Sequence, residues 1–160
     1  MKLIKIGLFL ALAGCLIQAG PASPEPVVFV ASSPCDMIPR AMLSIPADAP
    51  CEFIKWRLAL QRDPRPQQQQ SPTMYTLDYT YGMTKPITMD FLNGGTSLEK
   101  TGKWAVRKEP GNREIYVLNP DTPETTISFI RLDDNLLHLL DREGKLMIGH
   151  GGWSYTLNRK

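Results

Sequence analysis

Residues 45–60, with the sequence IPADAPCEFIKWRLAL, lead from a stretch rich in Pro and Ala into the first clear β-strand of the chain. Pro46 and Pro50 exclude a helix, and each proline biases the residue before it toward extended backbone. From residue 55, charged or small side chains alternate with large apolar ones, which are Trp56, Leu58 and Leu60. Because successive side chains of a strand point to opposite faces, this pattern predicts a strand with one face buried.

Further strands are expected along the rest of the chain. The clearest begins near residue 75 and collects Tyr75, Leu77, Tyr79 and Tyr81 on one face. Shorter runs of the same kind cover 27–30, 87–91, 102–106, 115–118, 127–132, 136–140, 146–148 and 153–157. Gly, Pro and Asn fill the gaps as turns require, and residues 63–72 are polar enough for a solvated loop. No segment after the N-terminal region has convincing helical periodicity.

About nine strands at short spacing predict an all-β domain. A regular series of strands leaves exposed edges unless it closes on itself, so we expect a small antiparallel up-and-down β-barrel. Residues 27–30 are expected to form an edge strand. Side chains can fill the interior of such a barrel, or it can hold one small ligand, and the sequence leaves both alternatives open.

The N-terminal residues have the features of a secretion signal. Lys2 and Lys5 precede an apolar run at 6–13, and this run is far shorter than the roughly 20 residues that span a bilayer. It ends in Leu12-Ala13-Gly14-Cys15, which resembles a bacterial lipobox. We therefore expect cleavage before Cys15 and acylation of its thiol. The alternative is an ordinary secretory peptide that is cut further along the chain.

These features divide the chain into a lipoprotein signal peptide at 1–14, a flexible tether at 15–26 and one β-barrel domain at 27–160. The lipid would hold the protein on a membrane without spanning it, since each buried methylene contributes about 0.8 kcal/mol. Leu16, and not Asp, follows the acylated residue, which in enterobacterial lipoproteins favours the outer membrane. We expect a protein on the bacterial outer membrane that faces the periplasm or the cell surface.

Two cysteines, Cys35 and Cys51, lie within the predicted domain. The compartment is oxidising, so one disulfide is expected. It would close a loop of roughly 15 residues and contribute on the order of 3 kcal/mol to stability. The alternative is a pair of thiols near Met37 and Met42 that forms a soft site for Cu(I).

We predict that the chain is not an enzyme, because no nucleophile stands beside a base in a recognisable arrangement. His138 lies within the run LLHLL and is expected to be an ordinary strand residue. His150 lies in a Gly-rich loop with no second ligand at zinc spacing. The carboxylates near the C-terminus occupy turn positions and are Asp133, Asp134, Asp141 and Glu143. A net charge of +2 argues neither for nor against an acidic partner, but the sequence has no run of Lys and Arg, so no nucleic-acid partner is expected.

Several short motifs follow one another in a distinctive order. Residues 46–51 (PADAPC) precede the strand at 54–60, and after them come Tyr75-Thr76-Leu77, Gly102-Lys103-Trp104, residues 136–144 (LLHLLDREG) and Tyr155-Thr156-Leu157. In the order and spacing of these motifs, the chain resembles the N-terminal domain of the NlpE-type copper-homeostasis and envelope-stress lipoproteins over roughly residues 43–160. The resemblance implies a lipocalin-like barrel with roles in copper homeostasis, surface sensing and stress signalling through an envelope partner protein.

The chain departs from this family at the copper site. Where family members have Cys-x-x-Cys, this chain has Ala47 and, after one extra residue, Cys51. The resemblance implies copper as the ligand of this region. Cys35 could supply the second sulfur only if residues 27–39 fold beside Cys51.

Two other functions are compatible with the sequence. One is a carrier that holds a small hydrophobic ligand inside the barrel, lined by the inward candidates Trp56, Tyr75, Tyr79, Trp104 and Phe129. The same aromatic set would also form a filled core. The other is a protein-binding lipoprotein, such as a lysozyme inhibitor, whose loops would enter an enzyme cleft.

Overall fold

The computed structural model describes residues 25–61, 73–88 and 90–160. In this part of the chain eight antiparallel strands form a closed barrel with one short α-helix. The predicted all-β fold class and the up-and-down barrel are therefore confirmed. The predicted signal peptide, Cys15, nearly all of the tether and the loop at 63–72 lie outside the described residues.

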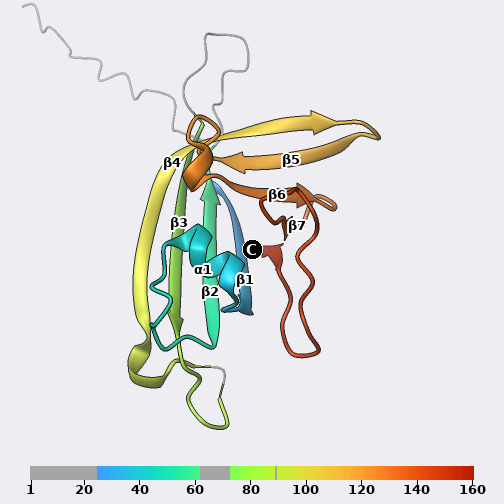
Figure 1. The fold of residues 1–160 in the computed structure, drawn as a ribbon. Helices are drawn as coiled ribbons and strands as arrows, with labels where there is room; N and C mark the ends of the chain where they lie inside the picture. The colour runs from blue at the N-terminus through green and yellow to red at the C-terminus, as the bar shows by residue number, and fades with distance from the viewer. Residues whose placement is uncertain (1–24, 62–72, 89) are drawn as a thin grey trace, which may run out of the picture.

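The elements follow one another around the barrel in chain order (Figure 1). The strands are β1 (Val27–Pro34), β2 (Phe53–Leu60), β3 (Met74–Gly82), β4 (Thr96–Glu109), β5 (Arg113–Leu118), β6 (Ile127–Arg131), β7 (Leu136–Leu139) and β8 (Thr156–Arg159). The helices are α1 (Met37–Leu43) and the short 3-10 helices η1 (Leu92–Gly94) and η2 (Pro123–Thr125). Each strand pairs with the next, and β8 closes the barrel by pairing with β1.

The prediction that residues 27–30 form an edge strand is wrong. β1 pairs with β2 along its full length and with β8 at Phe29 and Val30. Closure gives partners to main-chain groups that an open edge would leave unpaired. A local run of β-branched residues carries no information about this second partner, which comes from the other end of the chain.

α1 is a helix where none was predicted. Its seven residues, MIPRAML, make about two turns, which is too short for periodicity to appear. Pro39 lies in the first turn, where its missing N–H group would have no partner within the helix. Ser44 ends the helix in the left-handed conformation, with φ of 61°.

Among the described residues, the strands predicted at 87–91 and 146–148 are not formed, and residue 89 of the first lies outside the description. Phe91 makes only an isolated β-bridge, to Thr84, and its ring stacks on that of Phe53 with the centroids 4.1 Å apart. In the second segment only Leu146 makes a β-bridge, to Leu140. A short alternation of apolar and polar side chains predicted strands here, but no strand pairs with either segment along its described length. The last strand also begins at Thr156 and not at residue 153.

β4 is the longest strand, and its two halves have different neighbours. Residues 96–103 pair with β3, whereas residues 104–109 pair with β5. In Figure 1 β4 (yellow) rises along one side of the barrel and then turns across its top, where β5 returns beside it. The strand predicted at 102–106 covers only the bend between the two halves. Residues 96–101 lack alternation of apolar and polar side chains, so the first half was not predicted.

The barrel interior is packed with aromatic side chains. All five inward candidates are buried, namely Trp56, Tyr75, Tyr79, Trp104 and Phe129. Met42, Leu43 and Ile45, from the segment after β1, belong to the same cluster. A smaller cluster consists of Ile115 and Val117 from β5, Ile130 from β6 and Leu140, which follows β7.

Candidate functional site: the disulfide-closed segment

Cys35 and Cys51 form a disulfide, with their Cα atoms 5.8 Å apart. Cys35 follows the last residue of β1, and Cys51 lies two residues before β2. Because Pro34 and Phe53 face each other in the β1–β2 register, the two cysteines meet at the same end of this strand pair. The structure thus has the disulfide and not the pair of free thiols, and it places residues 27–39 beside Cys51. We call residues 35–51 the disulfide-closed segment.

Arg40 holds this segment from within. Its guanidinium group donates hydrogen bonds to four backbone carbonyl oxygens, at 3.0 Å to Cys35, Pro46 and Ala47 and at 3.1 Å to Cys51. Arginine suits this task because its planar group carries five N–H donors in a fixed arrangement. The sequence pattern gave no signal for Arg40, since its partners are carbonyl groups that any residue carries.

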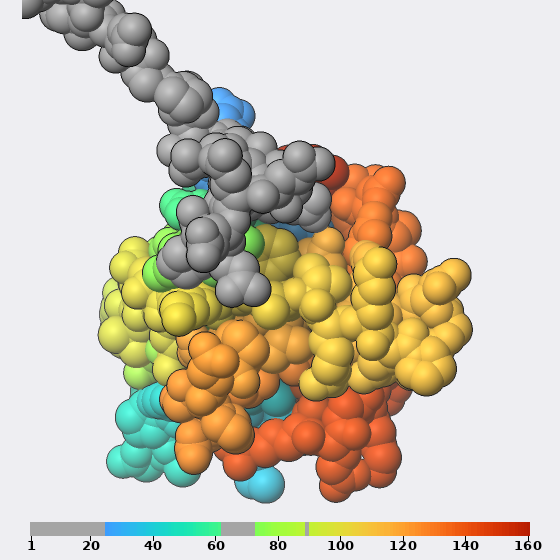
Figure 2. Space-filling view, turned by 90° about the horizontal axis from the view of Figure 1, so that it is seen from above, coloured from blue at the N-terminus to red at the C-terminus, as the bar shows by residue number. Residues whose placement is uncertain are grey.

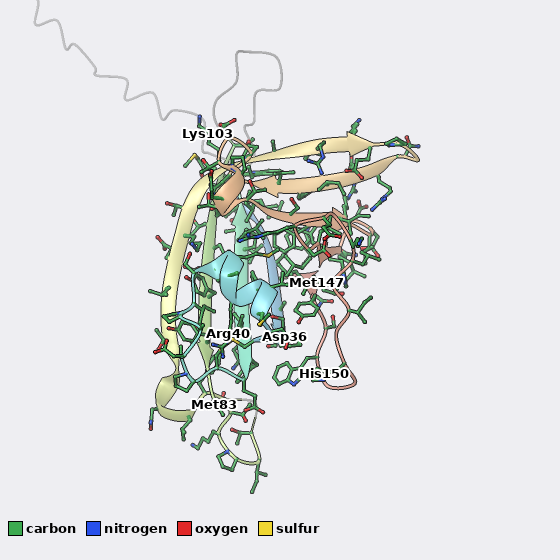
Figure 3. The ribbon with its side chains drawn as sticks, viewed as in Figure 1. Asp36, Arg40, Met83, Lys103, Met147 and His150 are labelled. Atoms are coloured by element: carbon green, nitrogen blue, oxygen red, sulfur yellow. A yellow bond between two sulfur atoms is a disulfide. The ribbon has the colours of Figure 1, made fainter. Side chains whose placement is uncertain are left out.

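The segment is also fixed to the barrel by buried contacts. Leu43 is fully buried, and its carbonyl oxygen accepts a hydrogen bond of 2.8 Å from the Tyr79 hydroxyl on β3. The Tyr155 hydroxyl donates to the Asp36 carboxylate. Burial raises the pKa of Tyr155, and the negative charge of Asp36 raises it further. Figure 3 shows Asp36 and Arg40 on the α1 side of the barrel.

The two histidines do not extend this site into a metal centre. Both ring nitrogens of His138 are engaged, Nδ1 with the Thr156 hydroxyl at 2.9 Å and Nε2 with the Met147 carbonyl at 2.8 Å. His150 lies in a tight turn and exchanges backbone hydrogen bonds with Trp153. Among the described residues, no three His, Cys, Asp or Glu side chains come together as a possible metal site.

The carboxylates near the C-terminus stabilise turns. Asp133 Oδ1 accepts a hydrogen bond of 2.7 Å from the Asn135 backbone, and Asp141 Oδ1 accepts bonds from the backbones of Glu143 and Lys145. Asp134 instead pairs with Arg131. The Arg131 guanidinium donates hydrogen bonds to the carboxylates of Glu114 and Asp134, and these bonds raise its pKa. These contacts account for the three aspartates near the C-terminus, and Glu143 pairs with Lys145 at 2.6 Å.

Three of the five inward aromatic side chains use their polar atoms within the fold. Trp56 Nε1 donates to the Ser33 hydroxyl at 2.8 Å, and Trp104 Nε1 donates to the Gln61 carbonyl at 3.0 Å. Tyr79 bonds to Leu43, as described above.

A cavity of about 230 Å³ lies where the chain enters the barrel, with Val27, Phe29, Tyr116, Arg131, Asp133, Asp134, Leu137 and Arg159 around it. Pockets for organic ligands usually have about 300–1,000 Å³, so this cavity is small for a carrier.

Comparisons with protein-family models, with curated proteins and with solved structures found no significant match to this chain. In the described part of the chain, no helix has the length and apolar character needed to cross a bilayer.

Proposed function

We propose that this chain is a lipid-anchored protein of the bacterial envelope of the NlpE type, with a role in copper homeostasis or envelope-stress sensing. The observation that carries the proposal is the pairing of Cys35 with Cys51 in a barrel that follows a lipobox-like sequence. Disulfides persist in oxidising compartments such as the bacterial periplasm. A barrel held by a disulfide therefore suits a protein that is exported and acylated at Cys15.

The same two cysteines are the residues that would hold copper. In the disulfide they carry no thiolate, which is the form of cysteine that binds metals. After reduction, two thiolates whose Cα atoms lie 5.8 Å apart would suit Cu(I), since soft sulfur ligands select this ion. Copper binding by this segment is thus expected only in the reduced protein.

Metabolic labelling tests the anchor. The full chain is expressed in a bacterium that is fed an alkyne analogue of palmitate, and the label is detected after purification. We expect label on the parent and on Cys35→Ser/Cys51→Ser, but none on Cys15→Ala. Label that persists on Cys15→Ala would contradict acylation at this residue.

Competition with a Cu(I) chelator of known affinity tests the metal role. The reduced parent, the oxidised parent and Cys35→Ser/Cys51→Ser are titrated without oxygen. We expect the reduced parent to take Cu(I) from the chelator at least tenfold more effectively than the other two. Equal competition by all three proteins would remove copper from the proposal and leave the lipid anchor unaffected.

A further inference from the structure

Among the described strands, none pairs with the outer backbone edge of the first half of β4. β4 pairs with β3 over residues 96–103, and β5 joins only from residue 104. The backbone N–H of Trp104 donates a hydrogen bond to the Thr73 carbonyl, and this bond identifies which residues of β4 face the strand β3. Since every second residue of a strand faces the same neighbour, residues 96, 98, 100 and 102 bond to β3. Ser97, Glu99 and Thr101 therefore direct their N–H and C=O groups away from it.

These outward groups make no backbone hydrogen bond within the part of the chain that the structure describes. Among the described residues, backbone hydrogen bonds outside the strand ladders include one from Asn119 to the Lys103 carbonyl but none to Ser97, Glu99 or Thr101. All three residues are exposed. In Figure 2 the yellow residues, which include β4, spread across the visible face of the molecule.

The side chains along this edge also lack cover. Leu98 points to the same face of the sheet as the buried Tyr79 opposite it, yet 45% of its surface is exposed. An open groove of about 420 Å³ continues from this edge and is mainly apolar. Residues around it include Ala49, Pro50, Tyr81, Met83, Leu92 and Thr96.

Lys100 adds a charge to this surface. It shares the face of Leu98, and its ammonium group contacts the Ser44 hydroxyl at 3.3 Å. Among the ion pairs of the described residues, none includes Lys100. A carboxylate on an incoming strand, two residues from an apolar side chain, would complement Lys100 and Leu98 together.

We propose that the free edge of β4 at residues 97–101 binds an extended segment of a partner protein, which adds as an antiparallel strand. Backbone hydrogen bonds to Ser97, Glu99 and Thr101 would hold the segment, as in other cases of strand addition. On the face of the bound segment that Leu98 and Lys100 share, an acidic residue lies opposite Lys100 and an apolar residue lies opposite Leu98. The proposal does not depend on acylation or on copper.

Charge favours this partner over a second copy of the chain. An antiparallel pair of two β4 edges that uses all three outward residues would centre on Glu99. It would place Glu99 opposite Glu99 and Lys100 opposite Leu98, and like charges that face each other destabilise strand pairing. Charged residues on an edge also discourage nonspecific pairing, which restricts the edge to a complementary strand.

The probe is a synthetic peptide, acetyl-Thr-Thr-Glu-Thr-Val-Thr-Thr-amide, and the control peptide carries N-methyl groups on the nitrogens that would face β4. Binding is followed by NMR of the protein. We expect the amides of Ser97, Glu99 and Thr101 to shift and to exchange with solvent at least tenfold more slowly when the probe is bound. The N-methylated peptide should bind at least tenfold more weakly. Equal binding of both peptides, or shifts confined to other strands, would overturn the proposal.

A matched pair of variants tests the same edge from the protein side. Glu99→Pro removes an N–H group that faces outward, so the ladder with β3 stays intact, whereas Glu99→Thr also removes the carboxylate but keeps the N–H group. We expect Glu99→Pro to lose probe binding at least tenfold and Glu99→Thr to stay within threefold. A cooperative thermal unfolding transition serves as the check that both variants are folded. If the parent sediments as a dimer that Glu99→Pro converts to a monomer, the occupant is a second copy and the proposal of a partner peptide fails.

Discussion

At the scale of single residues, Arg40 explains how an irregular segment keeps one conformation. The carbonyl groups that accept its hydrogen bonds come from both ends of the disulfide-closed segment, at Cys35 and Cys51, and from its central turn. Backbone groups outside regular elements need partners when they are removed from water. Lysine carries its charge at one point and lacks the planar fork of arginine, so it is a poor substitute.

We predict that Arg40→Lys lowers the free energy of unfolding by about 2 kcal/mol, since the partly buried hydrogen bonds to the carbonyl groups of Cys35 and Cys51 are lost along with two exposed ones. Urea denaturation of the oxidised protein measures the change. Arg57→Lys is the matched control, because Arg57 makes one exposed ion pair with Asp78 and should cost less than about 1 kcal/mol. Equal losses in both variants would show that the carbonyl contacts of Arg40 add nothing.

At the scale of elements, β1, α1 and β2 form a unit in which a helix is tied to a strand pair. The β1–β2 register brings the ends of the two strands together, and the disulfide joins the chain just beyond them. Met42, Leu43 and Ile45 then enter the barrel core. The helix is too short to be stable alone, so its conformation depends on the disulfide, on Arg40 and on this burial.

Loss of the disulfide should therefore weaken the unit without unfolding the barrel. For Cys35→Ala/Cys51→Ala we predict a loss of about 3 kcal/mol in the free energy of unfolding, which is the value for a closed loop of this length. Urea denaturation measures it, and hydrogen exchange should increase most at residues 36–50. The parent treated with a reductant is the control and should behave alike. An unchanged exchange rate in α1 would show that the other contacts suffice.

At the scale of the whole molecule, buried tyrosines from distant parts of the chain make the barrel sensitive to alkali. Burial raises the pKa of Tyr75, Tyr79 and Tyr155 above the ordinary value. The folded state thus holds these protons more tightly than the unfolded state does. Their contribution to stability is fully present below a pH of about 10 and is lost as the pH rises further.

We predict that the free energy of unfolding, measured by urea denaturation, falls as the pH increases above about 10, by at most about 1.4 kcal/mol per pH unit for each tyrosine. In Tyr155→Phe the free energy of unfolding should fall less steeply with pH, by up to about 1.4 kcal/mol per pH unit, because one titrating proton is removed. The same variant should cost about 1 kcal/mol at neutral pH, because its hydrogen bond to Asp36 is lost. A decline of the same slope in parent and variant would mean that Tyr155 does not contribute.

The sequence by itself determined the fold class, the order of most strands and the five inward aromatic side chains. These follow from a periodicity of two and from turn residues, which are local properties. Only the tertiary structure decided which strands pair. It gave β1 a strand partner on each side, brought Cys35 to Cys51 and, among the described strands, left residues 96–103 of β4 paired on one edge only, with β3. Contacts between residues far apart in sequence, such as Tyr155 with Asp36, depend on barrel closure, which no local pattern encodes.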